Sequence, residues 1–379
     1  MCLFKSLQMA LFPLAIITLF WKDHIGMSVT DIMVVQAVLA ATVVLAEFPS
    51  GYIADRLGYR STLILSAVLA TLGWGIYLFA DNYWQVLAGE MLYGISMALV
   101  SGTDQSLMFE SLTELKKQAD YPKWSGRIQA FGQVGEGLAA LTAATAYIFH
   151  FRGPFALEIV VCAVNILVAC ALIEPNRSKP VFGKSIQQIR DILKYVFITT
   201  PRLRNIMVFT LCLGLSSFVP VWLIQLYAEQ AGAGLQTLSL NWALANLVVA
   251  LGAFASYRFK NRFGLVTSLA FCIFLVVVGY LGLGLNHMTY GFAFYYLITF
   301  MRGLNGPILM NEKQLLITST NRAGMLSLQS LMFRATFIIV GPTVGFFVDS
   351  HGMHTVFIAL GIVFGCLSVL FLWNLTARR

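Results

Sequence analysis

Charged residues are scarce in this sequence of 379 residues: Asp, Glu, Lys and Arg together make up only 11% of it. A soluble globular domain usually carries roughly 25% charged residues. So low a charge excludes a soluble enzyme, a disordered chain and a nucleic-acid-binding domain. The formal net charge of +8 therefore does not indicate a nucleic-acid partner. In so apolar a chain it indicates cationic loops on the cytoplasmic side of a membrane.

Paired cysteines and clustered metal ligands are also missing from the sequence. The six cysteines stand singly within apolar runs, so neither a zinc site nor a disulfide framework is indicated. The pair His351 and His354 has only Asp349 as a close acidic residue, and we expect no metal site there. There is no G-x-x-x-x-G-K-[ST] loop, which argues against ATP as an energy source. We therefore expect neither a metal nor a cofactor.

What the sequence has in abundance is apolar length, since hydrophobic residues make up 58% of it. A helix needs roughly 20 apolar residues to cross a bilayer, and about twelve such runs occur between Gly, Pro and charge clusters. The runs cover 5–21, 30–50, 61–80, 84–108, 126–149, 154–173, 204–227, 237–257, 265–285, 289–315, 325–348 and 353–374. The sequence therefore predicts an all-α integral membrane protein with twelve transmembrane helices.

A polar, basic segment divides these runs into two groups of six. We expect an N-terminal six-helix bundle over residues 1–174, a cytoplasmic linker over 175–203 and a C-terminal six-helix bundle over 204–379. Within the linker, residues 184–197 have the pattern of a short amphipathic helix at the membrane surface.

The positive charges predict the orientation of the chain. If both termini are cytoplasmic, the external segments hold only Lys22 and Arg152, and Arg302 and Arg334 fall within spans. Every other Lys and Arg then lies in a cytoplasmic segment, as the positive-inside rule requires. We expect a monomeric, multi-pass protein in the lipid bilayer of the cell inner (cytoplasmic) membrane.

The loop between the second and third spans reads GYIADRLGYR over residues 51–60. It resembles the signature of the major facilitator superfamily (MFS) of secondary transporters, G-x-x-A-D-R-x-G-x-R, and it lies at the expected place. The resemblance implies the MFS fold of two pseudo-symmetric six-helix bundles. It also implies a cytoplasmic gating motif made of Gly51, Asp55, Arg56, Gly58 and Arg60.

An eroded copy of the signature follows in the second half, over residues 257–264. Aligned on Arg-x-Gly, Asn261 stands where Asp55 stands, and Val266 stands where Arg60 stands. The copy supports an internal repeat of two six-helix bundles. Residues 101–112 and 322–331 resemble a prokaryotic subset of the superfamily whose substrates are mostly unassigned or drug-like. The stretch at Glu90 departs from the drug-antiporter pattern, which has an arginine low in this helix.

Ionisable groups at membrane depth are costly and usually functional. A carboxyl group buried in a cavity favours its protonated form, so it can take up and release a proton near neutral pH. The proton-coupling candidates are Glu136, Glu90 and then Asp104. Arg302 or Arg334 can bind a carboxylate or phosphate of a substrate. For each of these residues the alternative is a fixed ion pair between helices.

Two further groups of polar residues are predicted to contribute. A cytoplasmic charge cluster is expected from Glu47, Glu110, Arg127, Glu312 and Arg322. Besides the two arginines, the substrate-binding candidates are Tyr93, Gln133, Gln225, Tyr296, Asn305 and Gln329. For any one of these, an ordinary hydrogen bond between helices is the alternative.

The first hypothesis is a proton-coupled transporter that works by alternating access and exports an amphipathic organic solute. The second is an importer or exporter of an anionic carboxylate metabolite or siderophore, because of the two arginines. The third is a transport-dead membrane sensor or a membrane enzyme on the same fold. An enzyme would need a nucleophile and base, or a metal, at one membrane face, and we expect no enzymatic activity. The expected partners are a small-molecule substrate and protons.

Overall fold

The structure is a computed structural model, and it describes most of the chain. The described residues are 1–175, 190–191, 193–288, 290–316 and 322–376. Helices dominate these residues, and no strand occurs among them. Half of the amphipathic helix predicted over 184–197, residues 184–189 and 192, lies outside the described residues.

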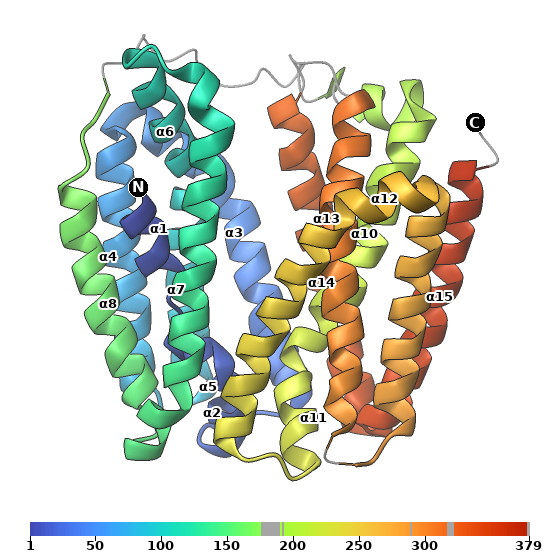
Figure 1. Cartoon of the computed structure of the whole chain (residues 1–379). Helices are drawn as coiled ribbons and strands as arrows, with labels where there is room; N and C mark the ends of the chain where they lie inside the picture. Colours follow the sequence, from blue (N-terminus) through green and yellow to red (C-terminus); the bar gives the residue numbers. More distant parts are fainter. Residues whose placement is uncertain (176–189, 192, 289, 317–321, 377–379) are drawn as a thin grey trace. The chain divides into compact units, whose positions relative to one another are not determined.

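The chain divides into two compact units (Figure 1). One comprises Met1–Gly183 together with Leu235–Ala243, and the other comprises Lys184–Gly234 together with Leu244–Arg379. The division after Gly183 falls within the segment 175–203 that the sequence predicts as a linker.

The helices of the first unit include two short 3₁₀ turns. They are α1 (Cys2–Met9), η1 (Phe12–Ala15), α2 (Ile17–Asp23), α3 (Val29–Leu57), α4 (Tyr59–Leu78), α5 (Tyr83–Val100), α6 (Thr103–Glu114), η2 (Gln118–Asp120), α7 (Tyr121–Phe149) and α8 (Gly153–Cys170). Helix α4 packs against α5 and α8, α3 packs against α5, and α1 packs against α7.

The second unit contains one π turn near its beginning. Its elements are η3 (Tyr195–Thr199), α10 (Pro201–Phe218), η4 (Val219–Trp222), α11 (Ile224–Gln230), α12 (Leu235–Leu285, whose first residues group with the other unit), η5 (Gly291–Phe294), α13 (Tyr295–Leu316), α14 (Arg322–His351) and α15 (Met353–Thr376). Helix α10 packs against α13, α14 and α15.

The twelve predicted spans all fall on these helices, which confirms the predicted fold class. Among the described residues, eight helical segments are long and apolar enough to cross a membrane. One of them, α12, has 51 residues, more than twice the roughly 20 that a bilayer requires. It contains two predicted spans, 237–257 and 265–285.

Several spans predicted as single helices are broken: 204–227 is divided into α10, η4 and α11, and two further breaks lie in the first unit. In the span 5–21, Pro13 has no N–H and restricts the residue before it. Helix α1 therefore ends at Met9, and the short η1 precedes α2. In the span 84–108, Gly102 adopts a left-handed φ of 80° between α5 and α6. Both breaks free backbone groups that need partners inside the membrane.

Both copies of the signature loop turn at the same glycine. Gly58 has φ 105° between α3 and α4, and Gly264 has φ 78° at a kink in α12. Only glycine adopts such values without strain. Four residues later in each copy, Thr62 donates to the Gly58 carbonyl at 2.6 Å and Ser268 donates to the Gly264 carbonyl at 2.7 Å. The two copies of the signature thus share their backbone conformation as well as part of their sequence.

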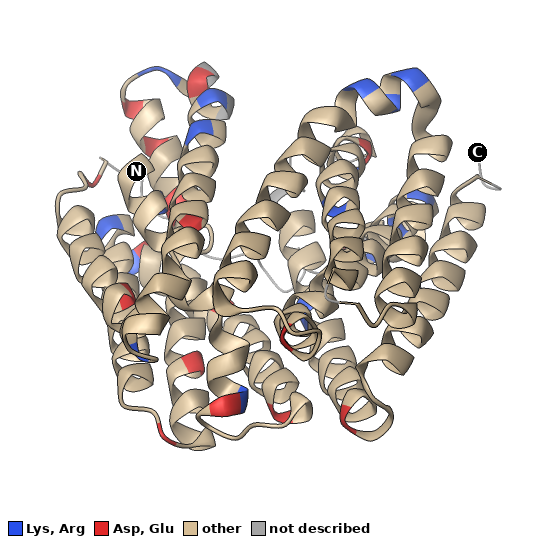
Figure 2. Cartoon of the chain, turned by 60° about the horizontal axis from the view of Figure 1, so that its bottom comes forward, with Lys and Arg blue, Asp and Glu red and all other residues tan. Residues whose placement is uncertain are grey.

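Lys and Arg gather near one end of each unit. Figure 2 shows them at the connection between α6 and α7 in the first unit, and around the kink of α12 in the second. These are loops that the sequence predicts as cytoplasmic, and the distribution within each unit agrees with the positive-inside rule.

Candidate functional site

Two glutamates lie buried inside the first unit. The exposed fraction is 3% for Glu90 on α5 and 0% for Glu158 on α8. Burial of an ionisable side chain within a helical membrane unit is costly, and it usually marks function. Whether these two carboxyl groups can bind and release protons therefore depends on their hydrogen-bond partners.

Glu90 is held by neutral donors from two neighbouring helices. The Tyr77 hydroxyl on α4 donates to the carboxyl group at 2.6 Å, and the side chain of Gln36 on α3 also hydrogen-bonds to it. All three side chains are buried. Packing of α3 and α4 against α5 brings these groups together, and their hydrogen bonds satisfy the carboxyl group without a cation.

Glu158 is bound to the break in the first span. Its Oε2 accepts the Phe12 N–H at 2.9 Å. Phe12 opens η1, where no preceding helical turn supplies an acceptor for that N–H. The second described partner is the Cys162 thiol, whose sulfur lies 3.6 Å from Oε1. The carboxyl group thus caps the broken helix, and both of its described partners are uncharged.

A group of aromatic side chains lies near both glutamates, because Tyr77 bonds to Glu90 while Trp74 and Tyr93 line a cavity with Glu158. Tyr77 stacks on Phe155 with ring centroids 5.3 Å apart, and Trp74 lies 5.2 Å from Tyr77 and 5.3 Å from Tyr93. The Tyr93 hydroxyl interacts electrostatically with Glu158, Cys162, Glu90 and Glu136. The half-buried Glu136 on α7 therefore belongs to the same electrostatic neighbourhood as the two buried acids.

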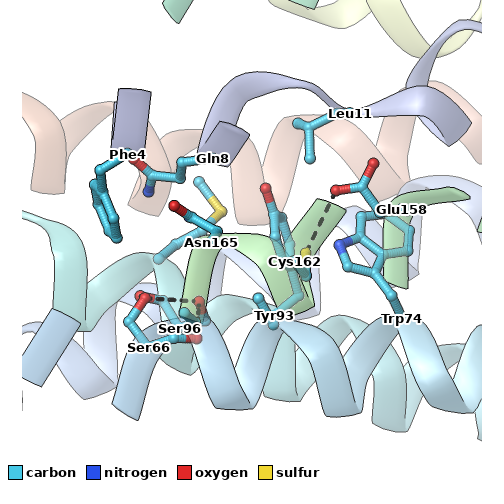
Figure 3. A pocket seen from close by; sticks show the side chains of 13 residues that line it. Phe4, Gln8, Leu11, Ser66, Trp74, Tyr93, Ser96, Glu158, Cys162 and Asn165 are labelled. Atoms are coloured by element: carbon cyan, nitrogen blue, oxygen red, sulfur yellow. Dashed lines mark hydrogen bonds between the residues drawn. The ribbon is translucent and has the colours of Figure 1, made fainter. Parts of the chain in front are cut away.

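A small cavity lies beside Glu158 (Figure 3). Its walls come from α1, α4, α5 and α8 and the residue Leu11 between α1 and η1. The lining residues are Phe4, Gln8, Leu11, Ser66, Ala67, Ala70, Trp74, Tyr93, Ser96, Met97, Glu158, Cys162 and Asn165. The hydroxyl groups of Ser66 on α4 and Ser96 on α5 hydrogen-bond to each other, with their oxygens 3.0 Å apart. The cavity is thus polar on several sides and lies within one unit.

The third proton-coupling candidate is part of an ion pair. Lys5 on α1 lies 3.2 Å from Asp104, at the start of α6. The same ammonium group donates to Gln8 at 3.1 Å, and Gln8 reaches the cavity. Asp104 thus makes an ion pair between helices, which is the alternative that the sequence left open.

The part of the signature loop that opens α4 is bound by Glu174, four residues after the end of α8. Glu174 accepts the backbone N–H of Tyr59 at 2.9 Å and of Arg60 at 2.6 Å. The Arg60 guanidinium in turn donates to the Cys170 carbonyl. The carboxylate satisfies free N–H groups at the start of α4, where the helix dipole favours negative charge. Gly51, Asp55 and Arg56 are exposed, and Arg56 lies over the Tyr52 ring.

Replacing Glu174 with Ala is expected to lower the stability of the protein. The variant loses the acceptor for two helix N-terminal N–H groups, and loss of a helix cap typically costs about 1 kcal/mol. Thermal unfolding of the purified protein in detergent would measure the change. The half-buried Glu110 of α6 offers a control, because Glu110→Ala should leave the melting temperature close to that of the parent. Equal melting temperatures for the two variants would contradict the cap.

In the second unit, the charge cluster centres on Glu312. Its carboxylate lies 2.7 Å from Lys260 on α12 and 3.8 Å from Arg202 on α10. The side chain of Arg322, predicted to join Glu312, lies outside the described side chains. In the first unit, Arg127 lies over the Trp124 ring, and Glu47 accepts from Ser101 at 3.4 Å.

The remaining substrate-binding candidates are differently placed. Arg302 and Gln133 are exposed, Arg334, Tyr93, Tyr296 and Gln329 are half-buried, and Gln225 and Asn305 are buried. Asn305 donates to the Met301 carbonyl at 3.0 Å, and Gln329 donates to the Met207 carbonyl at 3.3 Å. Gln329 thus makes the hydrogen bond between helices that the sequence left open as the alternative, whereas Asn305 bonds to the backbone of its own helix.

Sequence reasoning missed Glu158, Lys5 and Glu174. Glu158 carried the same signal that selected Glu90, an acidic residue within an apolar run, and it could have been found. Lys5 and Glu174 lie near the ends of spans, where charged residues are common. Their roles become visible only with the helices in place.

Comparisons with known proteins agree with this architecture. The model of the Major Facilitator Superfamily matches residues 2–312. The uncharacterized MFS-type transporter YxaM of Bacillus subtilis (strain 168) is 24% identical over 200 residues, which cover 51% of this chain and 48% of that relative. The match thus spans about half the length of the curated relative.

Solved structures share the fold. The nucleoside transporter NupG has a TM-score of 0.77 at 13% identity, covering 99% of this chain and 97% of that chain. A D-xylose-proton symporter has a TM-score of 0.76 at 14% identity, covering 99% and 96%. The signature loop, the internal repeat and the family match together show that the chain belongs to the major facilitator superfamily.

Proposed function

We propose that the protein is a proton-coupled transporter that works by alternating access and exports an amphipathic organic solute. The observation that carries this proposal is the burial of Glu90 and Glu158 in one helical unit with uncharged hydrogen-bond partners. A carboxyl group without a cationic partner can exist as a neutral acid inside the membrane. It can therefore carry a proton, whereas a glutamate in a permanent salt bridge would stay ionised.

Proton binding at Glu158 would weaken the hydrogen bond that holds the break in the first predicted span. An ionised carboxylate accepts the Phe12 N–H in a charge-assisted hydrogen bond, which is stronger than the bond to a neutral acid. Protonation therefore weakens the cap on η1 and favours a different arrangement of α1 and α2. A ligand that binds two conformations unequally shifts their populations. The proton is that ligand in this proposal.

The choice of coupling ion and solute has further support. One structural neighbour is named a D-xylose-proton symporter and another a nucleoside transporter. Hydroxyl, amide and aromatic side chains along the helices suit a solute of mixed polarity. The clustering of Lys and Arg at one end of each unit supports an inner-membrane location with both termini cytoplasmic.

Proton coupling can be tested in proteoliposomes with a trapped pH-sensitive dye. Candidate solutes are first selected by thermal shift of the purified protein, because a ligand that binds the native state raises its melting temperature. A solute gradient should then drive proton movement, and a pH jump should drive solute uptake or release. Solute flux without proton movement would contradict the coupling. Binding without any flux would favour a transport-dead sensor.

An anionic solute is the second candidate, and Arg302 favours it. The side chain is exposed in the middle of α13, although its neighbours Met301 and Gly303 are buried. A guanidinium group facing hydrocarbon is costly, so charged side chains in spans face protein or water. This face of α13 is therefore expected to border a water-filled path. A guanidinium there can bind a carboxylate through two hydrogen bonds.

Replacing Arg302 with Gln is expected to weaken binding of anionic solutes by roughly tenfold or more, since a hydrogen bond to a charged group contributes about 1.5–3 kcal/mol. Affinities of matched carboxylate and amide solutes would be compared by isothermal titration. The amide should bind both proteins equally. Arg302→Lys keeps the charge and should lose less affinity than the Gln variant. Equal losses for both solutes would remove the anion-binding role.

A further inference from the structure

The cavity beside Glu158 presents two buried polar atoms that lack a described hydrogen-bond partner. They are Nε1 of Trp74, a donor, and Oδ1 of Asn165, an acceptor. Their side chains are only 4% and 5% exposed. Buried polar groups in proteins are nearly always paired with protein or with ordered water. An orphaned donor and an orphaned acceptor on the walls of one cavity therefore each point to a small polar partner inside it.

The chemistry of the walls identifies that partner as water. The cavity has a volume of about 20 Å³, enough for one water molecule but not for an organic solute. Water needs two to four polar partners to stay bound. Water in this cavity has Trp74 as a donor, and Asn165 and the Glu158 carboxyl group as acceptors, on the surrounding walls. Glu158 and Asn165 lie two turns apart on one face of α8, so both reach the same cavity (Figure 3).

The opposite wall leads toward less buried charged groups. Gln8 lines the cavity and accepts from Lys5, which pairs with Asp104. The side chains of Lys5 and Asp104 are 16% and 12% exposed, against 0% for Glu158. A series of polar groups thus connects Glu158, through the cavity and Gln8, to the Lys5–Asp104 ion pair, and the ion pair is more exposed to solvent than Glu158 is.

We propose that this cavity is a water site within the first unit, and that its water connects Glu158 to the Lys5–Asp104 pair as a proton path. The path rests on the proposed function, because it supplies the proton that Glu158 carries. The step is a transfer of H⁺ from hydronium or water to the Glu158 carboxylate, with the proton replaced from the Asp104 side, and no bond to carbon changes. The other titratable groups facing this region are Cys162, Tyr93, Glu90 and Glu136.

Hydroxyl-radical footprinting of the purified wild-type protein in lipid nanodiscs tests the water site. Radiolysis of bound water oxidises the side chains that touch it, even when they are buried. Trp74 and Met97 should therefore be oxidised at least about tenfold faster than Trp21, which is fully buried in the same unit and does not line the cavity. Similar rates for Trp74 and Trp21 would overturn the proposal.

The variant Asn165→Leu gives a second, independent test. If water fills the cavity, this change removes one partner of the water and lowers the melting temperature. If the cavity is dry, the change removes an unsatisfied oxygen and raises the melting temperature, which would overturn the proposal. A variant that does not fold leaves the footprinting result to decide.

Deuterium uptake at the carboxyl group tests the path itself. Infrared spectra of the wild-type protein minus those of Glu158→Gln isolate the C=O band of Glu158. The rate at which this band shifts in D₂O should fall at least about tenfold in Ala70→Leu, which fills the cavity from α4. An unchanged rate would overturn the path. These readouts need no solute, so a hydrated Glu158 without solute-driven proton flux would refute the proposed function and leave the water site standing.

Discussion

Replacing Glu158 with Gln is expected to abolish solute-driven proton flux, reducing it to the rate in liposomes without protein. Gln cannot titrate, but its carbonyl oxygen can still accept the Phe12 N–H that Glu158 caps. Stability should therefore change by less than about 1 kcal/mol, the net worth of a typical hydrogen bond. Proton flux would be followed with a trapped dye in proteoliposomes, and folding by thermal unfolding of the same preparation.

Two further variants separate the proton from the cap. Glu158→Leu removes the acceptor and leaves the Phe12 N–H unpaired in the interior, which should cost about 1–3 kcal/mol of stability. Glu90→Gln keeps an acceptor for Tyr77, because the amide carbonyl can take the place of the carboxyl oxygen. If Glu90→Gln abolishes proton flux and Glu158→Gln does not, the proton carrier is Glu90 and the cavity has no part in coupling.

Much of the fold follows from the sequence because bilayer thickness constrains it so strongly. A run of roughly 20 apolar residues has few alternatives to a spanning helix. The signature loop at 51–60 and its eroded copy then fix the repeat, and Gly58 and Gly264 show it in their backbone angles. The breaks at Pro13 and Gly102 were not predicted, because hydropathy is insensitive to one or two non-helical residues.

The site was harder to predict because it depends on which helix faces meet. Sequence reasoning selected Glu90, but it could not find Tyr77 as its donor, since the two belong to different helices. For Asp104 the sequence left an ion pair open as the alternative, but it could not identify the partner as Lys5, which α1 brings to within 3.2 Å. Pairing between helices decides whether an acidic residue can carry a proton, and no spacing along the chain encodes it.

The glycines around Glu136 have a packing role that the sequence alone could not show, because it depends on the helix that lies against them. Replacing Gly135 with Ala should destabilise the protein by about 3 kcal/mol, the upper range for overpacking a tight contact. A Cβ at Gly135 would overlap the Ser6 carbonyl oxygen of α1, and backbone cannot move aside as a flexible side chain can. One turn away, a Cβ at Gly132 would meet Lys5 and Met9 at 3.3 Å and 3.2 Å. Small residues therefore let α7 approach α1 closely.

Gly137 supplies the matched control, because it lies on the same helix two residues further on. A Cβ there would meet no described atom within 4 Å, so Gly137→Ala should be neutral or slightly stabilising, since Ala favours helix more than Gly does. The two variants can be compared by heating them and then measuring the fraction of protein that stays monodisperse. Fluorescence-detected size-exclusion chromatography gives this fraction. Displacing α1 would also move Lys5 and Gln8 away from the cavity, so Gly135→Ala should slow proton uptake by any molecules that remain folded. Equal heat stability of the two variants would mean that α1 does not pack against α7 at this glycine.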